Sequence, residues 1–162
     1  MTTPTSHLVQ AEKLTADALI DLYEIQITDP VAYVRFTNQP TLTWQGNTFE
    51  FLPCIMSGDK KSTDGQQSRP GLKIVNPEGL FNPFVFAGKL DKARVIRKRV
   101  LKEHVETNTN IFEQRLWYIS RVKSIVAGQF IEFELRMMTD GAAFQIPARM
   151  YTPDQGFPVV NI

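Results

Sequence analysis

Apolar and polar positions alternate along most of this chain, and the alternation predicts short β-strands that each bury one face. The clearest run covers residues 20–28, where Tyr23, Ile25 and Ile27 alternate with acidic and amide side chains. Clusters of turn-forming residues separate it from further runs of the same kind. We expect those further strands at residues 31–37, 42–44, 48–51, 72–75, 92–102, 116–122 and 131–137.

Eight or nine short strands with little helix indicate a mainly β fold, a single β-barrel or β-sandwich. The length of 162 residues favours one domain. We divide the chain into an N-terminal arm (1–19), a β domain (20–149) and a C-terminal tail (150–162). In the arm, Ser6 can cap a short helix that places Leu8 and nearby apolar residues on one face.

Two hairpins are predicted. In the first, Gln45-Gly46-Asn47 separates Trp44 from Phe49, and the Gly46-Asn47 pair tolerates the positive φ of a tight turn. Its aromatic side chains suit a core, a ligand platform or a partner interface. The second hairpin turns at Ala127-Gly128. There we expect Leu116, Tyr118 and Val122 to share the packed face, and Glu132 and Glu134 to face solvent or a polar partner.

Composition narrows the classes of function. The net charge is +1, which argues against a dedicated nucleic-acid binder. Neither a secretory signal nor an apolar run of about 20 residues, the length of a membrane helix, is present, so we expect a chain made and kept or assembled in the cytosol. Cys54, the single cysteine, excludes an internal disulfide, and we expect a small buried side chain there.

Motifs for nucleophile elbows, phosphate loops, zinc proteases and dinucleotide sites are all missing. We expect His7 and His104 to be plain surface residues, too loosely held for acid–base work. Glu132 and Glu134 share one side of a strand, which suits a carboxylate pair or, more simply, a solvated face. We therefore predict no catalytic residue, no cofactor and no metal.

The polar stretch of residues 57–68 is the clearest loop, long enough for function or disorder. Its acids, Asp59 and Asp64, flank Lys60 and Lys61. A hard cation prefers more oxygen ligands with less positive charge among them, so we discount calcium.

The segment of residues 89–102 carries seven basic residues against one acid, Asp91. A solvated strand face, an ion-paired contact with an acidic subunit and a DNA contact are all open; DNA is disfavoured because no aromatic stacking groups are interleaved. The tail FPVVNI is apolar and suits packing against a neighbour. The candidate interface residues are Arg94, Arg97, Lys98, Arg99, Phe157, Val159 and Val160.

Several short motifs, in order, resemble the phage minor tail protein L family of lambda-like siphophages. They are WQGNTF (44–49), SRPGLKIVN (68–76) and DGAAFQIPAR (140–149), with the strand WYISR (117–121) before the last. The resemblance covers residues 20–149. The motif residues to which we assign a structural role are Trp44, Gly46, Arg69, Pro70, Asp140, Gly141, Phe144, Pro147 and Arg149.

The resemblance implies a β-barrel of the tail-hub (tube-like) type, a structural baseplate component in the virion's tail tip that assembles in the host cytoplasm. It implies a trimeric ring that joins the tail tube and distal tail protein to the central fibre or receptor-binding assembly. Enzymatic activity, small-molecule substrates and membrane contact are not implied. Fuller family members carry a cysteine-rich extension linked to an iron–sulfur cluster; with Cys54 alone, we expect no cluster here.

Two rival functions stay open at this stage. The first is a small β-barrel that binds carbohydrate or peptide with residues 57–68 and Trp44 or Trp117. An enzyme of unfamiliar type would be built on Glu132 and Glu134. The first rival predicts a monomer with a saturable ligand, and the second predicts an activity lost when both glutamates become glutamine.

Overall fold

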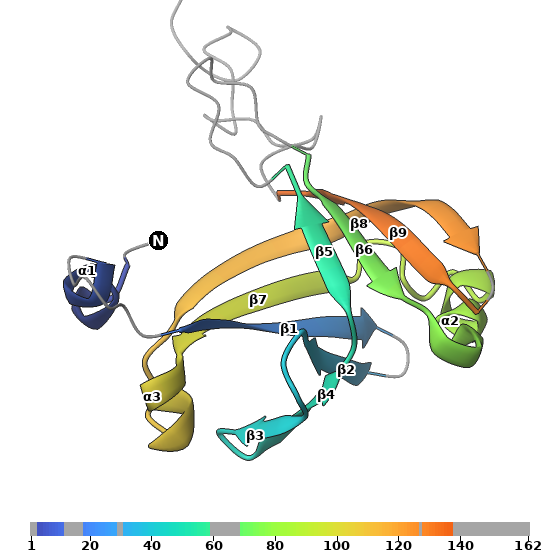
Figure 1. Ribbon diagram of the computed structural model, residues 1–162. Coiled ribbons are helices and arrows are strands. Elements are labelled where there is room, and N and C mark those ends of the chain that lie inside the picture. Colours follow the sequence, from blue (N-terminus) through green and yellow to red (C-terminus); the bar gives the residue numbers. More distant parts are fainter. Residues whose placement is uncertain (1–2, 12–17, 29–30, 59–68, 127, 138–162) are drawn as a thin grey trace, which may run out of the picture.

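A computed structural model describes residues 3–11, 18–28, 31–58, 69–126 and 128–137 (Figure 1). Within these residues the fold is mainly β, as expected, with a few short helices. The helices are α1 (Thr5–Ala11), the 3-10 turn η1 (Pro77–Gly79), α2 (Asn82–Phe86) and α3 (Lys102–Glu106). The strands are β1 (Leu19–Thr28), β2 (Val31–Thr37), β3 (Leu42–Trp44), β4 (Asn47–Phe51), β5 (Cys54–Ser57), β6 (Gly71–Val75), β7 (Arg94–Leu101), β8 (Glu113–Val126) and β9 (Phe130–Arg136).

The described strands form one nine-stranded sheet in the order β3-β4-β2-β1-β7-β8-β9-β6-β5. All neighbouring pairs are antiparallel except β2 and β4, which run parallel. The ladder has two free ends, β3 and β5, so the closed barrel that we expected is not confirmed. The mainly β class is confirmed, in the form of an open, mixed sheet.

The sheet nevertheless bends back on itself at one corner. Leu52 and Pro53 alone separate β4 from β5, although these strands lie near opposite ends of the ladder. Asn38, just after β2, grips β5: its Nδ2 donates to the Cys54 carbonyl at 2.8 Å, and its Oδ1 accepts from the Cys54 N–H at 2.6 Å. A side-chain amide therefore takes the place that a neighbouring strand would occupy in a closed barrel.

The larger core lies on the inner face of this bent sheet, where β5 crosses in front of β1 and β7 (Figure 1). We call the opposite side the outer face. The inner core includes Ile25, Val95, Trp117, Ile119 and Phe133, each fully buried. Burying side chains of this size contributes about 1.5–3 kcal/mol each.

A smaller core lies on the outer face at one end of the sheet. Ile20, Leu22 and Val100 project from β1 and β7, and Trp44 and Phe49 of the β3–β4 hairpin cover them. Val105 of α3 and Phe112 complete the cluster. The hairpin and α3 thus cover this end of the outer face only.

The packed face of β8 differs from our expectation. Trp117 and Ile119 are buried, whereas Leu116 and Tyr118 lie half-buried on the other face. Register shifts between Ile119 and Arg121, and again after Val122, interrupt the alternation. Because a bulge inserts an extra residue, it returns Val122 to the core face. Strict period-two reading across the bulge therefore assigned Leu116 and Tyr118 to the wrong face.

The helices also correct one expectation. Ser6 lies inside α1 and does not precede it, so it is not the cap; its hydroxyl is buried without a described partner. Residues 80–88 contain the five-residue α2, with Pro83 in its first turn, where proline is tolerated. None of the described helices is both long and apolar enough to cross a bilayer.

Candidate functional site

The β3–β4 hairpin is tied to the segment between α3 and β8. Gln45 and Gly46, with φ of 52° and 72°, are the positive-φ pair of the turn, one residue earlier than expected. The Gln45 N–H donates to Asn108 Oδ1 at 2.8 Å, and its Nε2 donates to the Asn108 carbonyl at 2.6 Å. The Trp44 Nε1 donates to the Thr109 carbonyl at 3.2 Å. The rings of Trp44 and Phe112 lie edge to face, with their centres 5.5 Å apart.

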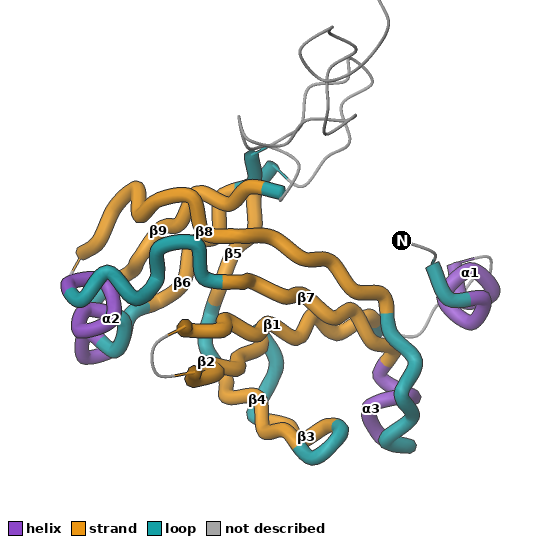
Figure 2. Tube along the Cα trace, turned by 180° about the vertical axis from the view of Figure 1, so that it is seen from behind, coloured by secondary structure: helices purple, strands orange, loops and turns teal. Residues whose placement is uncertain are grey.

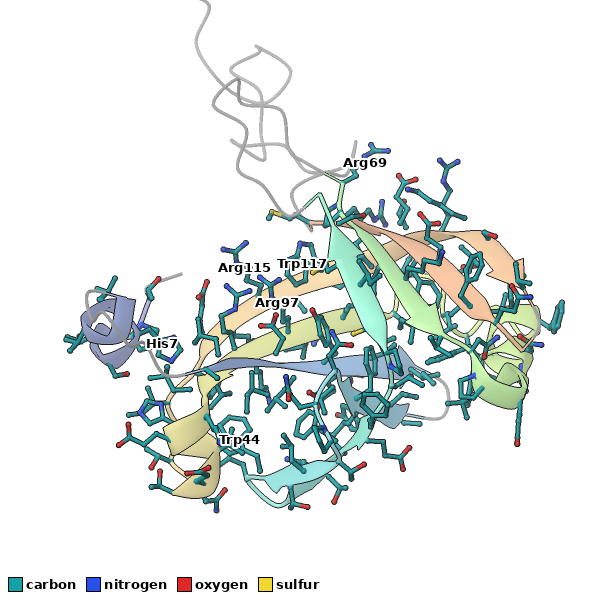
Figure 3. All side chains as sticks on the ribbon, in the orientation of Figure 1. His7, Trp44, Arg69, Arg97, Arg115 and Trp117 are labelled. Carbon is teal, nitrogen blue, oxygen red and sulfur yellow. The ribbon has the colours of Figure 1, made fainter. Side chains whose placement is uncertain are left out.

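Both tryptophans are core residues. Trp44 is 1% exposed and Trp117 is 0% exposed, and Figure 3 shows them on different parts of the sheet. A ligand platform needs an exposed aromatic face, so neither ring serves the carbohydrate- or peptide-binding alternative. Residues 59–68, the other part of that alternative, lie outside the described residues.

The basic strand β7 divides its cations between the two faces of the sheet. Arg97, expected on an exposed face, is 5% exposed on the inner side. Its guanidinium carbon lies 5.3 Å from the Trp117 ring centre, and its Nη1 lies 3.5 Å from the Met56 sulfur (Figure 3). The exposed-strand interpretation is therefore wrong for Arg97. Burial raises the pKa of the adjacent Tyr23 to about 12, an effect that Arg97 opposes.

Beyond Arg97, ion pairs replace the apolar core at this end of the inner face. Arg99 Nε lies 2.9 Å from Asp21 Oδ1, and this hydrogen bond raises the pKa of Arg99. On the neighbouring strand, Arg115 Nε lies 3.4 Å from Glu113 Oε1. Arg99 is thus held by Asp21 within this chain, while its predicted contact with a partner stays a prediction.

Arg94 and Lys98 lie on the outer face of the sheet. The Lys98 ammonium lies 5.6 Å from the Phe112 ring centre and 5.9 Å from that of Trp44. Such a cation over an aromatic face is stabilised by the ring quadrupole. Arg94 is exposed and stands opposite Tyr118 in the register between β7 and β8. These two residues are the members of the predicted basic interface that face outward.

A solvated face was the simpler expectation for Glu134, and it is wrong. Glu134 is 6% exposed and lies between Arg121, whose Nε is 2.8 Å from Oε2, and Arg69, whose Nη1 is 3.4 Å from Oε1. The hydrogen bond from Arg121, followed by the charges of both arginines, holds the pKa of Glu134 below its ordinary value. Glu132 pairs separately with Lys123 at 3.4 Å. Glu134 is paired with two arginines and Glu132 with a lysine, which does not favour a shared acid–base pair.

The Arg69-Pro70 motif sits where β6 begins. Arg69 reaches Glu134 of β9, and the carbonyl of the buried Pro70 accepts the Leu135 N–H at 2.8 Å. Two adjacent residues thus fasten the start of β6 to β9, by an ion pair and by a backbone hydrogen bond. These two contacts give the motif a structural role that the sequence alone did not predict.

The two histidines are not plain surface residues. His7 of α1 is 7% exposed and stacks against His104 of α3, with ring centres 6.1 Å apart. His7 Nε2 and His104 Nδ1 are both buried without a described hydrogen-bond partner. Burial lowers the pKa of His7, and the nearby His104 lowers it further. Glu113 raises this pKa, whereas Arg99 lowers it.

Other expectations have mixed outcomes. Cys54 is buried, as expected, and burial raises the pKa of its thiol to about 12. Within the described residues, no three or more His, Cys, Asp or Glu side chains are grouped to hold a metal ion. Several predicted residues lie outside the described part of the chain: Asp59, Asp64, Asp140, Gly141, Phe144, Pro147, Arg149, Phe157, Val159 and Val160.

Comparison with known proteins adds two findings. The model of the phage minor tail protein L family matches residues 31–156. A chain in a solved structure titled "Virion of native gene transfer agent (GTA) particle" shares the fold, with a TM-score of 0.63 and 22% identity. That alignment covers 93% of this chain and 50% of the other, so this chain spans half the length of its structural relative. No curated protein matches the chain.

Proposed function

Since the family match covers most of the sequence, this chain belongs to the phage minor tail protein L family, and we propose that it is a subunit of the tail-tip hub. In this proposal it forms a ring at the distal end of the tail. The ring joins the tail tube and distal tail protein to the central fibre or receptor-binding assembly. The family match over residues 31–156 carries the proposal.

Other observations support a structural role. The described fold agrees with that of a chain from a gene transfer agent virion. Glu132 and Glu134, the carboxylates of the enzyme alternative, form ion pairs with separate cations. Both tryptophans are buried in cores. We therefore infer a protein that works by shape and association, without catalysis, a cofactor or a small-molecule substrate.

The ring in our proposal contains three copies, and its neighbours are other tail proteins. Arg94 and Lys98 on the outer face, together with Phe157, Val159 and Val160 of the C-terminal tail, are the proposed contact residues. Direct DNA contact and membrane contact are not part of the proposal. The site of action is the tail tip of the virion, after assembly in the host cytoplasm.

The experiment that tests this function is quantitative mass spectrometry of purified phage particles. We expect a few copies of the chain per particle, in a multiple of three and far below the number of tube subunits. Native mass spectrometry of the isolated protein at rising concentration then tests for the trimer. Complete absence of the chain from particles would overturn the proposal, and a copy number equal to that of the tube protein would place it elsewhere in the tail.

A further inference from the structure

The outer face of the sheet carries a row of three large side chains on adjacent strands. Arg94 of β7 stands opposite Tyr118 of β8, and Tyr118 stands opposite Arg136 of β9. Directly opposed residues point to the same face of a sheet, so all three project outward. With strands about 4.8 Å apart, the two arginine backbones are separated by about 10 Å.

The two arginines of this row differ from most others in the structure. Arg35, Arg69, Arg99, Arg115 and Arg121 each lie within ion-pair distance of a carboxylate. No described carboxylate forms an ion pair with Arg94 or Arg136. The chain therefore presents two guanidinium groups, one on each side of Tyr118, whose charges it does not neutralise within its described residues.

The surface beside the row is partly apolar. Ile96 stands opposite Leu116 on the same outer face, and both side chains are only half-buried. The small outer core of Trp44 and Phe49 lies toward the other end of β7. Figure 2, which views the molecule from behind, shows β7 and β8 crossing the view with no helix over their middle. Ile96 and Leu116 thus form an apolar margin to the basic row.

This combination fits a protein surface better than a nucleic acid. Arginine and tyrosine are enriched among the residues that contribute most to protein interfaces, and apolar neighbours exclude water from them. A phosphate backbone would reward more cations, and bases would need several exposed aromatic rings. The row offers one tyrosine, an aliphatic margin and two arginines that have no ion-pair partner among the described residues. Charge complementarity then requires carboxylates on the partner.

We propose that this outer face of β7, β8 and β9 docks an acidic, partly apolar surface of a neighbouring tail protein. Two partner carboxylates bind Arg94 and Arg136 across Tyr118, and an apolar side chain of the partner covers Ile96 and Leu116. The proposal rests on the tail role proposed above and names the chemistry of one contact within it. The proposed docking surface thus includes residues of β7, β8 and β9 and is not confined to the basic segment of residues 89–102.

Incorporation into particles tests the docking. A phage that lacks the native gene is complemented with the wild-type chain, with Arg94→Glu/Arg136→Glu, or with Lys89→Glu/Lys92→Glu as a control. The control changes the net charge equally, and its two lysines lie in the turn before β7, where Lys92 is exposed and Lys89 is half-buried. We expect the control at wild-type copy number and the arginine double variant at one-tenth of it or less. The fluorescence of buried Trp44 and Trp117 verifies that each variant is folded.

The two proposals fail in different ways. Absence of the wild-type chain from particles overturns the tail role. Equal copy numbers of the wild-type chain and the arginine double variant overturn only the proposed docking surface. A third outcome, loss of self-association by the double variant in native mass spectrometry, assigns the face to a second copy of this chain and likewise overturns the proposal.

A defined probe tests the chemistry of the partner. Hexaglutamate is titrated into the isotope-labelled protein by NMR, with a 20-base-pair DNA duplex as the rival ligand. We expect saturable shifts at Arg94, Tyr118 and Arg136 that weaken as salt rises, and at least a ten-fold loss of affinity in Arg94→Ala/Arg136→Ala. Binding of DNA but not hexaglutamate at this face overturns an acidic protein partner. Equal affinity of the wild type and the double variant for hexaglutamate overturns the assignment of Arg94 and Arg136 as the binding residues.

Discussion

Asn38 holds Cys54 by both ends of its side-chain amide, at 2.8 Å to the carbonyl and 2.6 Å from the N–H. This contact joins the end of β2 to the start of the edge strand β5. It adds a side-chain contact to the backbone hydrogen bond that the Leu52 N–H donates to the Thr37 carbonyl at 2.9 Å. An amide is suited to this position because it carries an N–H donor group and a carbonyl acceptor in a single plane.

Asn38→Ala tests this closure. We expect it to lower the free energy of unfolding by about 1–2 kcal/mol, since two hydrogen bonds to the backbone are lost. Asn38→Asp keeps the acceptor and loses the donor, and should also destabilise the fold. The measurement is urea-induced unfolding, with Asn110→Ala, another exposed asparagine, as the control. Equal stability of Asn38→Ala and Asn110→Ala would contradict a closing role for Asn38.

Arg97 and Arg94 lie three residues apart on β7 and face opposite sides of the sheet. We expect Arg97→Glu to cost about 3 kcal/mol of folding free energy, because it buries an anion that is not neutralised beside Trp117. Arg94→Glu should change stability by no more than about 0.5 kcal/mol, since the position is exposed. Thermal unfolding of the two variants gives the comparison. A stable Arg97→Glu protein would show that Arg97 is not part of the core.

Glu134 gives a pH dependence that follows from its two arginines. The pKa of Glu134 is lowered from its ordinary value of 4.5, so the folded chain holds the anion more strongly than the unfolded chain does. The resulting stabilisation is present above pH 4.5 and is lost as the pH falls below it. Arg69 and Arg121 are largely exposed, and solvent screening limits the effect to less than about 1 kcal/mol.

Comparison of wild type with Glu134→Gln measures this effect. The difference in urea-induced unfolding free energy should shrink between pH 7 and pH 3.5, because protonation removes the charge that the variant already lacks. Glu50→Gln, at an exposed position on β4, serves as the control and should not alter the pH profile. A difference that stays constant over this range would show that the charge of Glu134 contributes nothing.

His7 predicts a second pH dependence, confined to the N-terminal helix. Because burial and His104 lower the pKa of His7 below 6.5, the folded chain takes up protons less readily than the unfolded chain. The packing of α1 is therefore at full strength above pH 6.5 and weakens as the pH falls. NMR titration of the imidazole should place the His7 pKa below 6.5 and show it rising in His104→Gln. A His7 pKa at or above 6.5 in wild type would remove the expected weakening.

The C-terminal tail provides a test that separates assembly from folding. We expect deletion of residues 157–162 to reduce incorporation into particles, since its apolar side chains suit contact with a neighbour. The thermal unfolding of the isolated protein should be unchanged. Loss of the unfolding transition would instead show that these residues belong to the fold.

The strands followed from the sequence where the alternation was uninterrupted. Residues 31–37 and 42–44 match the observed strands, and the observed β1 begins one residue before the expected start. The packed face of β8 did not follow, because the bulge near Ser120 shifts the period within one continuous strand. The four-residue β5 was also missed, since so short a segment after Pro53 carries almost no periodic signal.

The side-chain contacts were harder to foresee than the strands. Arg97 and Arg94 belong to one basic run, and composition alone does not say which face of the strand each occupies. His7 is buried by His104, which lies far away in sequence. The hydrogen bonding between Asn38 and Cys54 likewise depends on the bend of the whole sheet. Such contacts arise from tertiary structure, so local sequence patterns do not predict them.

The pairing of β1 with β7 has a consequence for how this protein is made. Leu19 stands opposite Leu101, so the ribosome must deliver more than half of the chain before β1 can gain its second neighbour. Until then β1 can pair only with β2, and the edge of β1 that β7 later covers stays open. Pairing across such a distance in sequence is slow to form and leaves strand edges open in the meantime. Newly made chains are therefore most prone to aggregate before β7 arrives, a hazard that grows with the rate at which an infected cell produces them.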